Sequence, residues 1–176
     1  MKPEEKRNFT EKLHREYLIR KLNLNSMEPG GFDFSSKRHF LELKSRLCLF
    51  NAKGQVSNIW WALSEPQIKD YEERYESLEM DFLWILVHGL TRRPCRELNS
   101  KKQIRDSIYH RDIFIAPWEV YKLSPLGKEG ENTKTGPYRH ISRKKLAKLV
   151  ELYPLRLEGG TLYLPKQKGL EYLIKK

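Results

Sequence analysis

Residues 31–44, GFDFSSKRHFLELK, place an aspartate, a glutamate and a lysine among aromatic and aliphatic side chains that are typical of a buried hairpin. The pattern predicts two strands, at 31–35 and 39–50, joined by the polar residues SSKR. Since side chains alternate along a strand, the register of this hairpin decides which charges face the same side.

The three charges are expected to converge on one face. Glu42 and Lys44 are two residues apart on one strand, so both point to the same side. If SSKR forms a loop of two or four residues, residue 34 pairs with 39 and Asp33 joins that side. Two neighbouring carboxylates repel each other, and a hard divalent cation bound by both removes the conflict. We therefore expect a site for a divalent metal ion.

A simpler interpretation of the same charges is an ion pair on the protein surface. A glutamate and a lysine two apart on a strand often form such a pair, which contributes little to stability. The apolar flanks, the spacing of Asp33 from Glu42 and the basic composition of the chain favour the metal site.

The spacing also resembles a known motif. Asp33 is followed, after eight intervening residues, by Glu42, Leu43 and Lys44. This arrangement looks like the PD-(D/E)xK motif of metal-dependent nucleases, with Phe32 in place of the motif's proline. The resemblance implies hydrolysis of phosphodiester bonds that leaves a 5′-phosphate.

A second element of the same family falls on the next predicted helix. Gln67 and Tyr71, in PQIKDYEE, resemble the QxxxY element of some members, although a core contact with Tyr75 is the simpler interpretation. The order strand, strand, helix, central strand over residues 31–88 is similar as well. The resemblance implies an α/β (α+β) fold with a central mixed β-sheet flanked by helices, a restriction-endonuclease-like core.

The resemblance also implies a role for each residue of the site. The expected catalytic residues are Asp33, Glu42, Lys44 and Gln67. Asp33 and Glu42 would hold Mg²⁺ together with the main-chain carbonyl of Leu43. Lys44 would orient the attacking water and offset the charge that develops at phosphorus.

The remaining sequence predicts helices and strands around this hairpin. A helix is expected at 3–24, on which Glu16 could supply a further carboxylate but is more simply an exposed residue. Ser64 is the predicted N-cap of a helix at about 65–79, and the apolar run 81–89 predicts the central strand, covered on both faces. The other expected elements are turns at 25–31 and 51–55, a strand at 111–123 interrupted at Pro117, a loop at 124–140, a helix after Ser142, a hairpin around Gly159 and Gly160, and a short final helix.

The composition predicts one globular domain. The 176 residues are 39% hydrophobic and 32% charged, and we expect the catalytic core within about 1–90 and DNA-recognition elements within 91–145. No apolar run approaches the length of a membrane span, and MKPEEKRNF lacks the apolar core of a signal peptide. A cytoplasmic protein of prokaryotic or phage origin, without a membrane partner, is therefore expected. Cys48 and Cys95 are expected to be buried or idle thiols, because neither has a metal-ligand spacing.

The charge predicts a polyanionic partner. The chain has 34 Lys and Arg against 23 Asp and Glu, a net charge of +11, and double-stranded DNA is favoured over a merely lysine-rich surface. The basic excess lies at 92–105, 134–148 and 166–176. The expected DNA contacts, mainly to phosphates, are Arg92, Arg93, Lys134, Tyr138, Arg139, His140, Arg143 and Lys144, with Arg96, Lys101, Lys102, Asn132 and Lys145 beside them.

Two functional classes remain open from the sequence. A small protein that cuts both strands usually needs two active sites, so a homodimeric type II restriction endonuclease is expected. A homing endonuclease, a phage nuclease or a junction resolvase is similar, and a non-enzymatic DNA-binding module is the competing class. Trp60 and Trp61 could stack on bases, although core or dimer contacts are the simpler interpretation.

Overall fold

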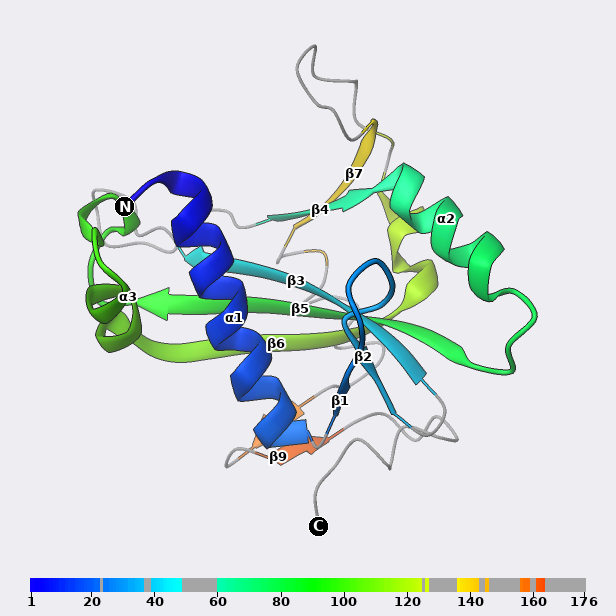
Figure 1. The fold of residues 1–176 in the computed structure, drawn as a ribbon, viewed down its shortest axis with the longest axis horizontal. Helices are drawn as coiled ribbons and strands as arrows, with labels where there is room; N and C mark the ends of the chain where they lie inside the picture. The colour runs from blue at the N-terminus through cyan, green and yellow to red at the C-terminus, as the bar shows by residue number, and fades with distance from the viewer. Residues whose placement is uncertain are drawn as a thin grey trace.

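The computed structural model describes residues 1–22, 24–36, 39–48, 60–124, 126, 136–142, 145, 156–158 and 161–163. These residues form an α+β fold in which a mixed five-stranded sheet is combined with three α-helices (Figure 1). The strand order is β1-β2-β3-β5-β6, and only β3 and β5 pair in parallel. The strands are β1 Asn25–Ser26, β2 Phe34–Ser35, β3 His39–Cys48, β5 Asp81–Thr91 and β6 Ile108–Pro117.

The helices lie on both sides of this sheet. The α-helices are α1 Pro3–Leu22, α2 Glu65–Tyr75 and α3 Lys101–Ser107, and the short 3₁₀ helices are η1 Cys95–Glu97 and η2 Trp118–Leu123. Two pairs of strands lie outside the main sheet, namely β4 Trp60–Ser64 with β7 Tyr138–Ser142 and β8 Arg156–Glu158 with β9 Thr161–Tyr163. Within the described residues, no helix is long and apolar enough to cross a membrane.

Each face of the sheet has its own hydrophobic core. On one face, Leu18 and Leu22 of α1 pack on Leu41 and Leu43 of β3 and on the neighbouring strands. On the other face, a cluster rich in aromatic residues joins α2, β4 and η2 to the sheet; it includes Phe32, Trp61, Ile68, Tyr71, Trp84 and Trp118. Glu42 and Lys44 alternate with Leu41 and Leu43, so they belong to this second, aromatic face.

Several predicted elements are confirmed. The first helix is present and ends at Leu22, and the second begins after Ser64, whose hydroxyl accepts the N–H of Gln67. The apolar run forms β5, whose residues 83–89 are all buried between β3 and β6. The hairpin around 159–160 is formed by β8 and β9. The break expected at Pro117 is present, but the strand predicted at 111–123 ends there: β6 covers Ile108–Pro117, and Trp118–Leu123 form the 3₁₀ helix η2 instead.

The opening hairpin differs from the prediction in length and register. The strand expected at 31–35 is only Phe34–Ser35, and Phe34 pairs with Leu41 where residue 39 was expected. The N–H of Ser36 bonds to the carbonyl of His39, which extends the pairing one step beyond Ser35 and Phe40. Because the register moves by two residues, the parity of the pairing is kept. Asp33 itself lies just before β2, and its carboxylate reaches the edge of β3 at the Leu43 N–H, close enough for its charge to act on Glu42.

Other predictions were wrong or fall outside the described residues. The expected turn at 25–31 contains β1, and residues 138–140 of the expected loop belong to β7. At the start of the predicted third helix, the Ser142 hydroxyl accepts the N–H of Lys145, as expected of an N-cap. The rest of that helix, the turn at 51–55 and the final helix lie outside the described residues. Cys95 is a buried thiol that is not part of a disulfide within the described residues.

Candidate active site

The site lies along an edge of β3 that β2 leaves open. β2 pairs only with Phe40 and Leu41, so from Glu42 onward this side of β3 has no strand partner within the described residues. Asp33, just before β2, replaces the absent strand at one point, because its Oδ2 accepts the main-chain N–H of Leu43 at 2.7 Å. The N–H and the carbonyl of one strand residue point to the same side, so the Leu43 carbonyl faces this edge too.

Three of the predicted catalytic residues form a closed set of hydrogen bonds. Oε1 of Glu42 accepts from Nζ of Lys44 at 2.7 Å and from Nε2 of Gln67 at 2.7 Å. Nζ of Lys44 also donates to Oε1 of Gln67 at 2.9 Å. The glutamine therefore holds both members of the ion pair from α2, and the pattern Glu-x-Lys on β3 with Gln67 on the next helix comes together as the motif suggested.

Glu42 has an unusual environment for a carboxylate. Only 4% of the residue is exposed, and Oε2 is buried without a hydrogen-bond partner. Burial raises the pKa of Glu42 to about 7; the charge of Lys44 opposes this shift, and the nearby charge of Asp33 adds to it. Near neutral pH both the protonated and the charged form of Glu42 are therefore populated, and one carboxylate oxygen has no hydrogen-bond partner.

Asp33 is paired with a cation that the sequence did not indicate. The guanidinium of Arg15, on α1, forms an ion pair with Oδ1 of Asp33. Nη1 of Arg15 also donates to the main-chain carbonyl of Asp33 at 3.1 Å, and the guanidinium lies 5.2 Å from the ring centre of Phe34. No motif marks Arg15, because the contact depends on how α1 crosses the sheet.

Tyr71 connects the site to the aromatic core. Its hydroxyl accepts from Nε2 of Gln67 at 3.1 Å and donates to the carbonyl of Gly31 at 2.6 Å. Its ring packs against Phe32, with 4.4 Å between ring centres. Burial and the nearby Glu42 raise the pKa of Tyr71, so its hydroxyl stays protonated. The core contact expected for Tyr71 is confirmed, and the residue also fixes Gln67.

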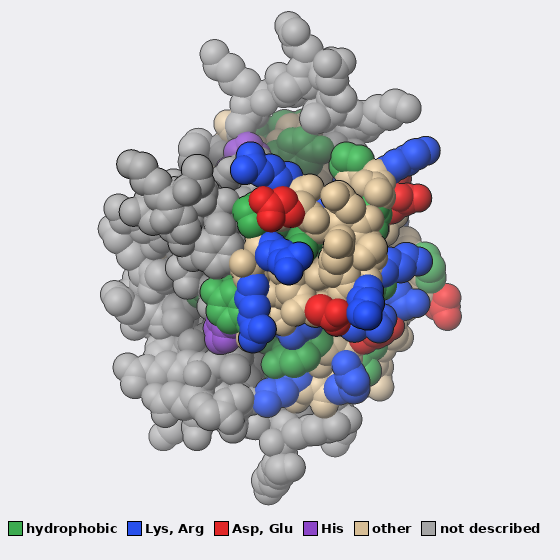
Figure 2. All heavy atoms as spheres, turned by 90° about the vertical axis from the view of Figure 1, so that its left-hand side faces the viewer, with side chains coloured by type: hydrophobic (Ala, Val, Ile, Leu, Met, Phe, Trp, Pro, Cys, Tyr) green, Lys and Arg blue, Asp and Glu red, His purple; other side chains and the backbone are tan. Residues whose placement is uncertain are grey.

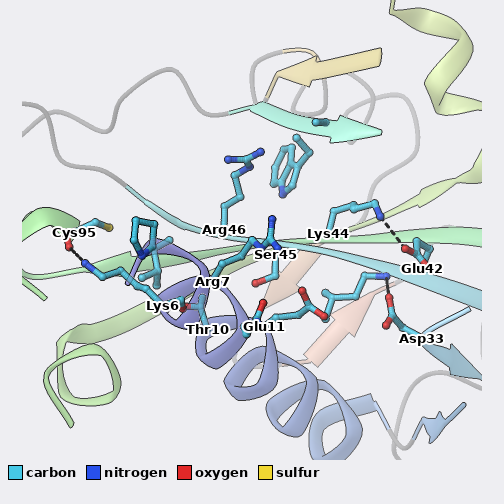
Figure 3. A pocket seen from close by; sticks show the side chains of 16 residues that line it. Lys6, Arg7, Thr10, Glu11, Asp33, Glu42, Lys44, Ser45, Arg46 and Cys95 are labelled. Atoms are coloured by element: carbon cyan, nitrogen blue, oxygen red, sulfur yellow. Dashed lines mark hydrogen bonds and ion pairs between the residues drawn. The ribbon is translucent and has the colours of Figure 1, made fainter. Parts of the chain in front are cut away.

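A pocket of about 710 Å³ runs along the open edge of β3, between α1 and β4. Asp33 and Glu42 line one end of it, and Cys95 lines the pocket as well (Figure 3). Glu11 of α1 also lines this pocket, whereas the exposed Glu16 does not. The carboxylate on the first helix that shares the pocket is thus Glu11, which the sequence reasoning did not select.

The site offers ligands of the kind that a divalent cation binds, but too few of them to complete its coordination shell. Asp33, Glu42 and the Leu43 carbonyl are hard oxygen donors of the type that Mg²⁺ binds. The buried, unpartnered Oε2 of Glu42 is the atom that most needs a partner. Among the described residues no cluster of three or more His, Cys, Asp or Glu side chains could hold a metal ion, so water or substrate oxygens would have to complete the shell.

The predicted DNA contacts are spread over two regions. Arg92 and Arg93 are exposed directly after β5. The side of the molecule that carries the start of α1, η1 and α3 shows more Lys and Arg than acidic side chains (Figure 2). The exposed basic residues of η1 and α3 are Arg96, Lys101, Lys102 and Arg105.

The second region is more varied. Arg139, on β7, forms an ion pair with Glu65 at 2.6 Å and donates to the carbonyl of Ser124 at 2.9 Å, so its guanidinium links β7 to α2. Tyr138 and His140 lie beside it on β7. The other expected contacts lie outside the described residues; they are Asn132, Lys134, Arg143 and Lys144.

The two tryptophans can be separated only in part. Trp61 is 1% exposed and stacks on His88 with 3.9 Å between ring centres, so the expected core contact is confirmed for it. The side chain of Trp60 lies outside the described residues.

Comparison of the chain with protein-family models, with curated proteins and with solved structures found no match.

Proposed function

We propose that this protein is a Mg²⁺-dependent nuclease with a restriction-endonuclease-like core of the PD-(D/E)xK type, which hydrolyses phosphodiester bonds of DNA. The observation that carries the proposal is the environment of Glu42. A carboxylate is buried beside Asp33 with one oxygen unpartnered, and it is held by a lysine and a glutamine at the end of a pocket. Such an oxygen is costly to bury unless a ligand completes it.

Each residue of the set has a role in this proposal. Asp33, Glu42 and the Leu43 carbonyl would hold the ion, which would polarise the phosphate and lower the pKa of a bound water. Lys44 lies against Glu42 and presents its ammonium to the water and to the phosphate oxygens. Gln67 keeps Lys44 and Glu42 in place through one hydrogen bond to each. Binding the ion requires deprotonated Glu42 and the release of Asp33 from Arg15.

The biological role within this class follows from the composition. A basic, single-domain protein of this size with one such site suits a type II restriction endonuclease that acts on double-stranded DNA as a homodimer, one site for each strand. A homing endonuclease, a phage nuclease or a junction resolvase would use the same chemistry. A cytoplasmic location belongs to the same proposal.

One observation favours a second candidate, a basic DNA-binding module without catalytic activity. Both carboxylates already have a protein cation, Arg15 for Asp33 and Lys44 for Glu42. A module of this kind would use the pairs to join α1, β2 and β3, and its basic surface to bind phosphates. It would bind DNA equally well with and without divalent ions.

A plasmid-nicking assay separates the two candidates. The wild type is incubated with supercoiled plasmid and Mg²⁺, Mn²⁺ or EDTA, beside the variants Glu42→Ala and Lys44→Ala. The nuclease proposal expects cleavage only with Mg²⁺ or Mn²⁺ and a loss of at least a hundredfold in both variants. Glu16→Gln is the matched control, because it removes an exposed carboxylate outside the pocket. If the wild type binds DNA but does not cut it with any of the divalent ions tested, only the DNA-binding module remains.

A further inference from the structure

The pocket continues beyond the metal-binding end into a basic segment that the proposed chemistry does not use. Arg7 of α1 and Arg46 of β3 both line it (Figure 3). α1 runs antiparallel to β3, since Arg15 meets Asp33 at one end while His14 bonds to Ser45 at 2.7 Å. Two helical turns before Arg15, the chain therefore brings Arg7 beside Arg46.

These two arginines are held close despite their like charge. Burial and then the charge of Arg7 lower the pKa of the Arg46 guanidinium, which places the two groups within electrostatic reach of each other. Within the described residues, the guanidinium of Arg7 makes neither a hydrogen bond nor an ion pair. Along α1, Glu4 and Glu11 lie about one turn to either side of Arg7. Of these two, only Glu11 lines the pocket, and it lies one turn closer to Arg15 and hence to the Asp33 end.

The spacing along β3 fits a polymer with regularly placed negative charges. Lys44 and Arg46 project from the same face, and their backbone positions are about 6.6 Å apart along the strand, from a rise of about 3.3 Å per residue. This separation is similar to that of consecutive phosphates along an extended nucleic-acid strand. A guanidinium pair also matches phosphate oxygens better than an isolated lysine does, because each fork can donate two parallel hydrogen bonds.

The dimensions of the pocket limit what can enter it. A volume of about 710 Å³ is that of a site for a small ligand, so the pocket itself has room for a few nucleotides of one strand. Its walls are α1 on one side and Trp61 and Ala62 of β4 on the other. A strand lying along the open edge of β3 would pass Lys44 first and the two arginines next.

We propose that Arg7 and Arg46 form a second phosphate site, which binds the phosphate next to the one at Lys44 on the same nucleic-acid strand. The inference rests on the proposed function, because it takes the phosphate at Lys44 as the one that is cleaved. The substrate is thus defined as a strand with at least two consecutive phosphates at the site, and an isolated phosphodiester would be bound and cut poorly.

Binding of two short thymidine oligomers tests this site without cleavage. The probes are TpT, which has one phosphate, and TpTpT, which has two. The affinity of each is measured in Ca²⁺ buffer by competition with a fluorescent oligothymidylate. The measurement is made on the wild type and on the double variant Arg7→Gln/Arg46→Gln. Wild type should bind TpTpT at least tenfold more tightly than TpT, and the double variant should bind them within about twofold. Arg20→Gln, an exposed arginine of α1 outside the pocket, should behave as the wild type.

The outcomes that overturn the inference are distinct from failure of the nuclease proposal. A wild type that binds both oligomers alike, or a double variant that keeps the tenfold ratio with an unchanged melting temperature, removes the second phosphate site even if plasmid is cleaved. Equal competition by a polyglutamate peptide assigns the edge to an acidic peptide and also overturns it. If the wild type shows the tenfold preference for TpTpT and the double variant loses it, while no ion supports cleavage, the phosphate site is supported. Only the nuclease proposal is then contradicted.

Discussion

The raised pKa of Glu42 predicts that Glu42→Gln stabilises the metal-free protein, and that the gain depends on pH. Glutamine has nearly the shape of a protonated glutamate and the same charge. At pH 4 the wild-type carboxyl is protonated in the folded and unfolded states, so the two proteins should have similar stability. At pH 8 the wild type must keep a charged carboxylate buried, and the variant does not.

The magnitude follows from linkage between proton binding and folding. The pKa of Glu42 is about 7 in the folded protein against a model value of 4.5. A group with a raised folded pKa contributes stability that is fully present below the unfolded pKa and is lost as pH rises through the folded value. The window is therefore pH 4.5 to 7, and the wild type should lose about 3 kcal/mol relative to Glu42→Gln across it.

Denaturant titration at several pH values provides the assay. Free energies of unfolding in urea are measured for both proteins with EDTA present between pH 4 and pH 8, and their difference is plotted against pH. Taking this difference removes carboxyls that titrate alike in both proteins. The matched control is Glu16→Gln, whose carboxylate is exposed and outside the pocket. Parallel curves for wild type and Glu42→Gln would refute the reasoning, because they would mean that burial does not penalise the charge.

Three further predictions concern packing and electrostatics around the site. Gly89→Ala should lower the free energy of unfolding by about 1–3 kcal/mol, because its Cβ would lie 2.8 Å from Nε2 of the fully buried His14; urea denaturation measures this. Tyr71→Phe should cost about 1 kcal/mol in the same assay, since it removes the hydroxyl between α2 and the chain before β2. Glu65→Gln should destabilise most above pH 4.5 and progressively less in acid, because the hydrogen bonds from Arg139 lower the pKa of Glu65; pH-dependent melting follows this loss, and a constant difference would contradict it.

The parts of the fold that could be predicted are those with a local signal. The continuous apolar run of β5 needs cover on both faces, whichever elements provide it, and Ser64 followed by Glu65 and Pro66 marks a helix start by hydrogen bonding alone. The first strand of the hairpin was overestimated because Gly30, with φ at 94°, and Gly31 belong to a bend whose carbonyls are held by α2. Those contacts join residues 40 or more apart in sequence.

The candidate site was predictable to the extent that parity determined it. Glu42 and Lys44 share a face in any register, so an error of two residues left them together, and Asp33 reaches their neighbourhood from the edge of the strand. Arg7, Glu11 and Arg15 were not selected, since their position at the site depends on the angle at which α1 crosses β3. Their spacing of four residues on α1 is an ordinary helical repeat and carries no marker of function. Arg46, on β3, was not selected because the motif ends at Lys44.

The open edge of β3 has a further consequence, for how the protein behaves in concentrated solution. Unpaired strand edges invite strands of other molecules to join the sheet, and natural proteins discourage this with charged side chains along the edge. Here Lys44 and Arg46 on the strand, with the Asp33 carboxylate on the Leu43 N–H, provide that protection. Variants that neutralise them are expected to self-associate more readily, so light scattering should accompany every binding or cleavage measurement made on them.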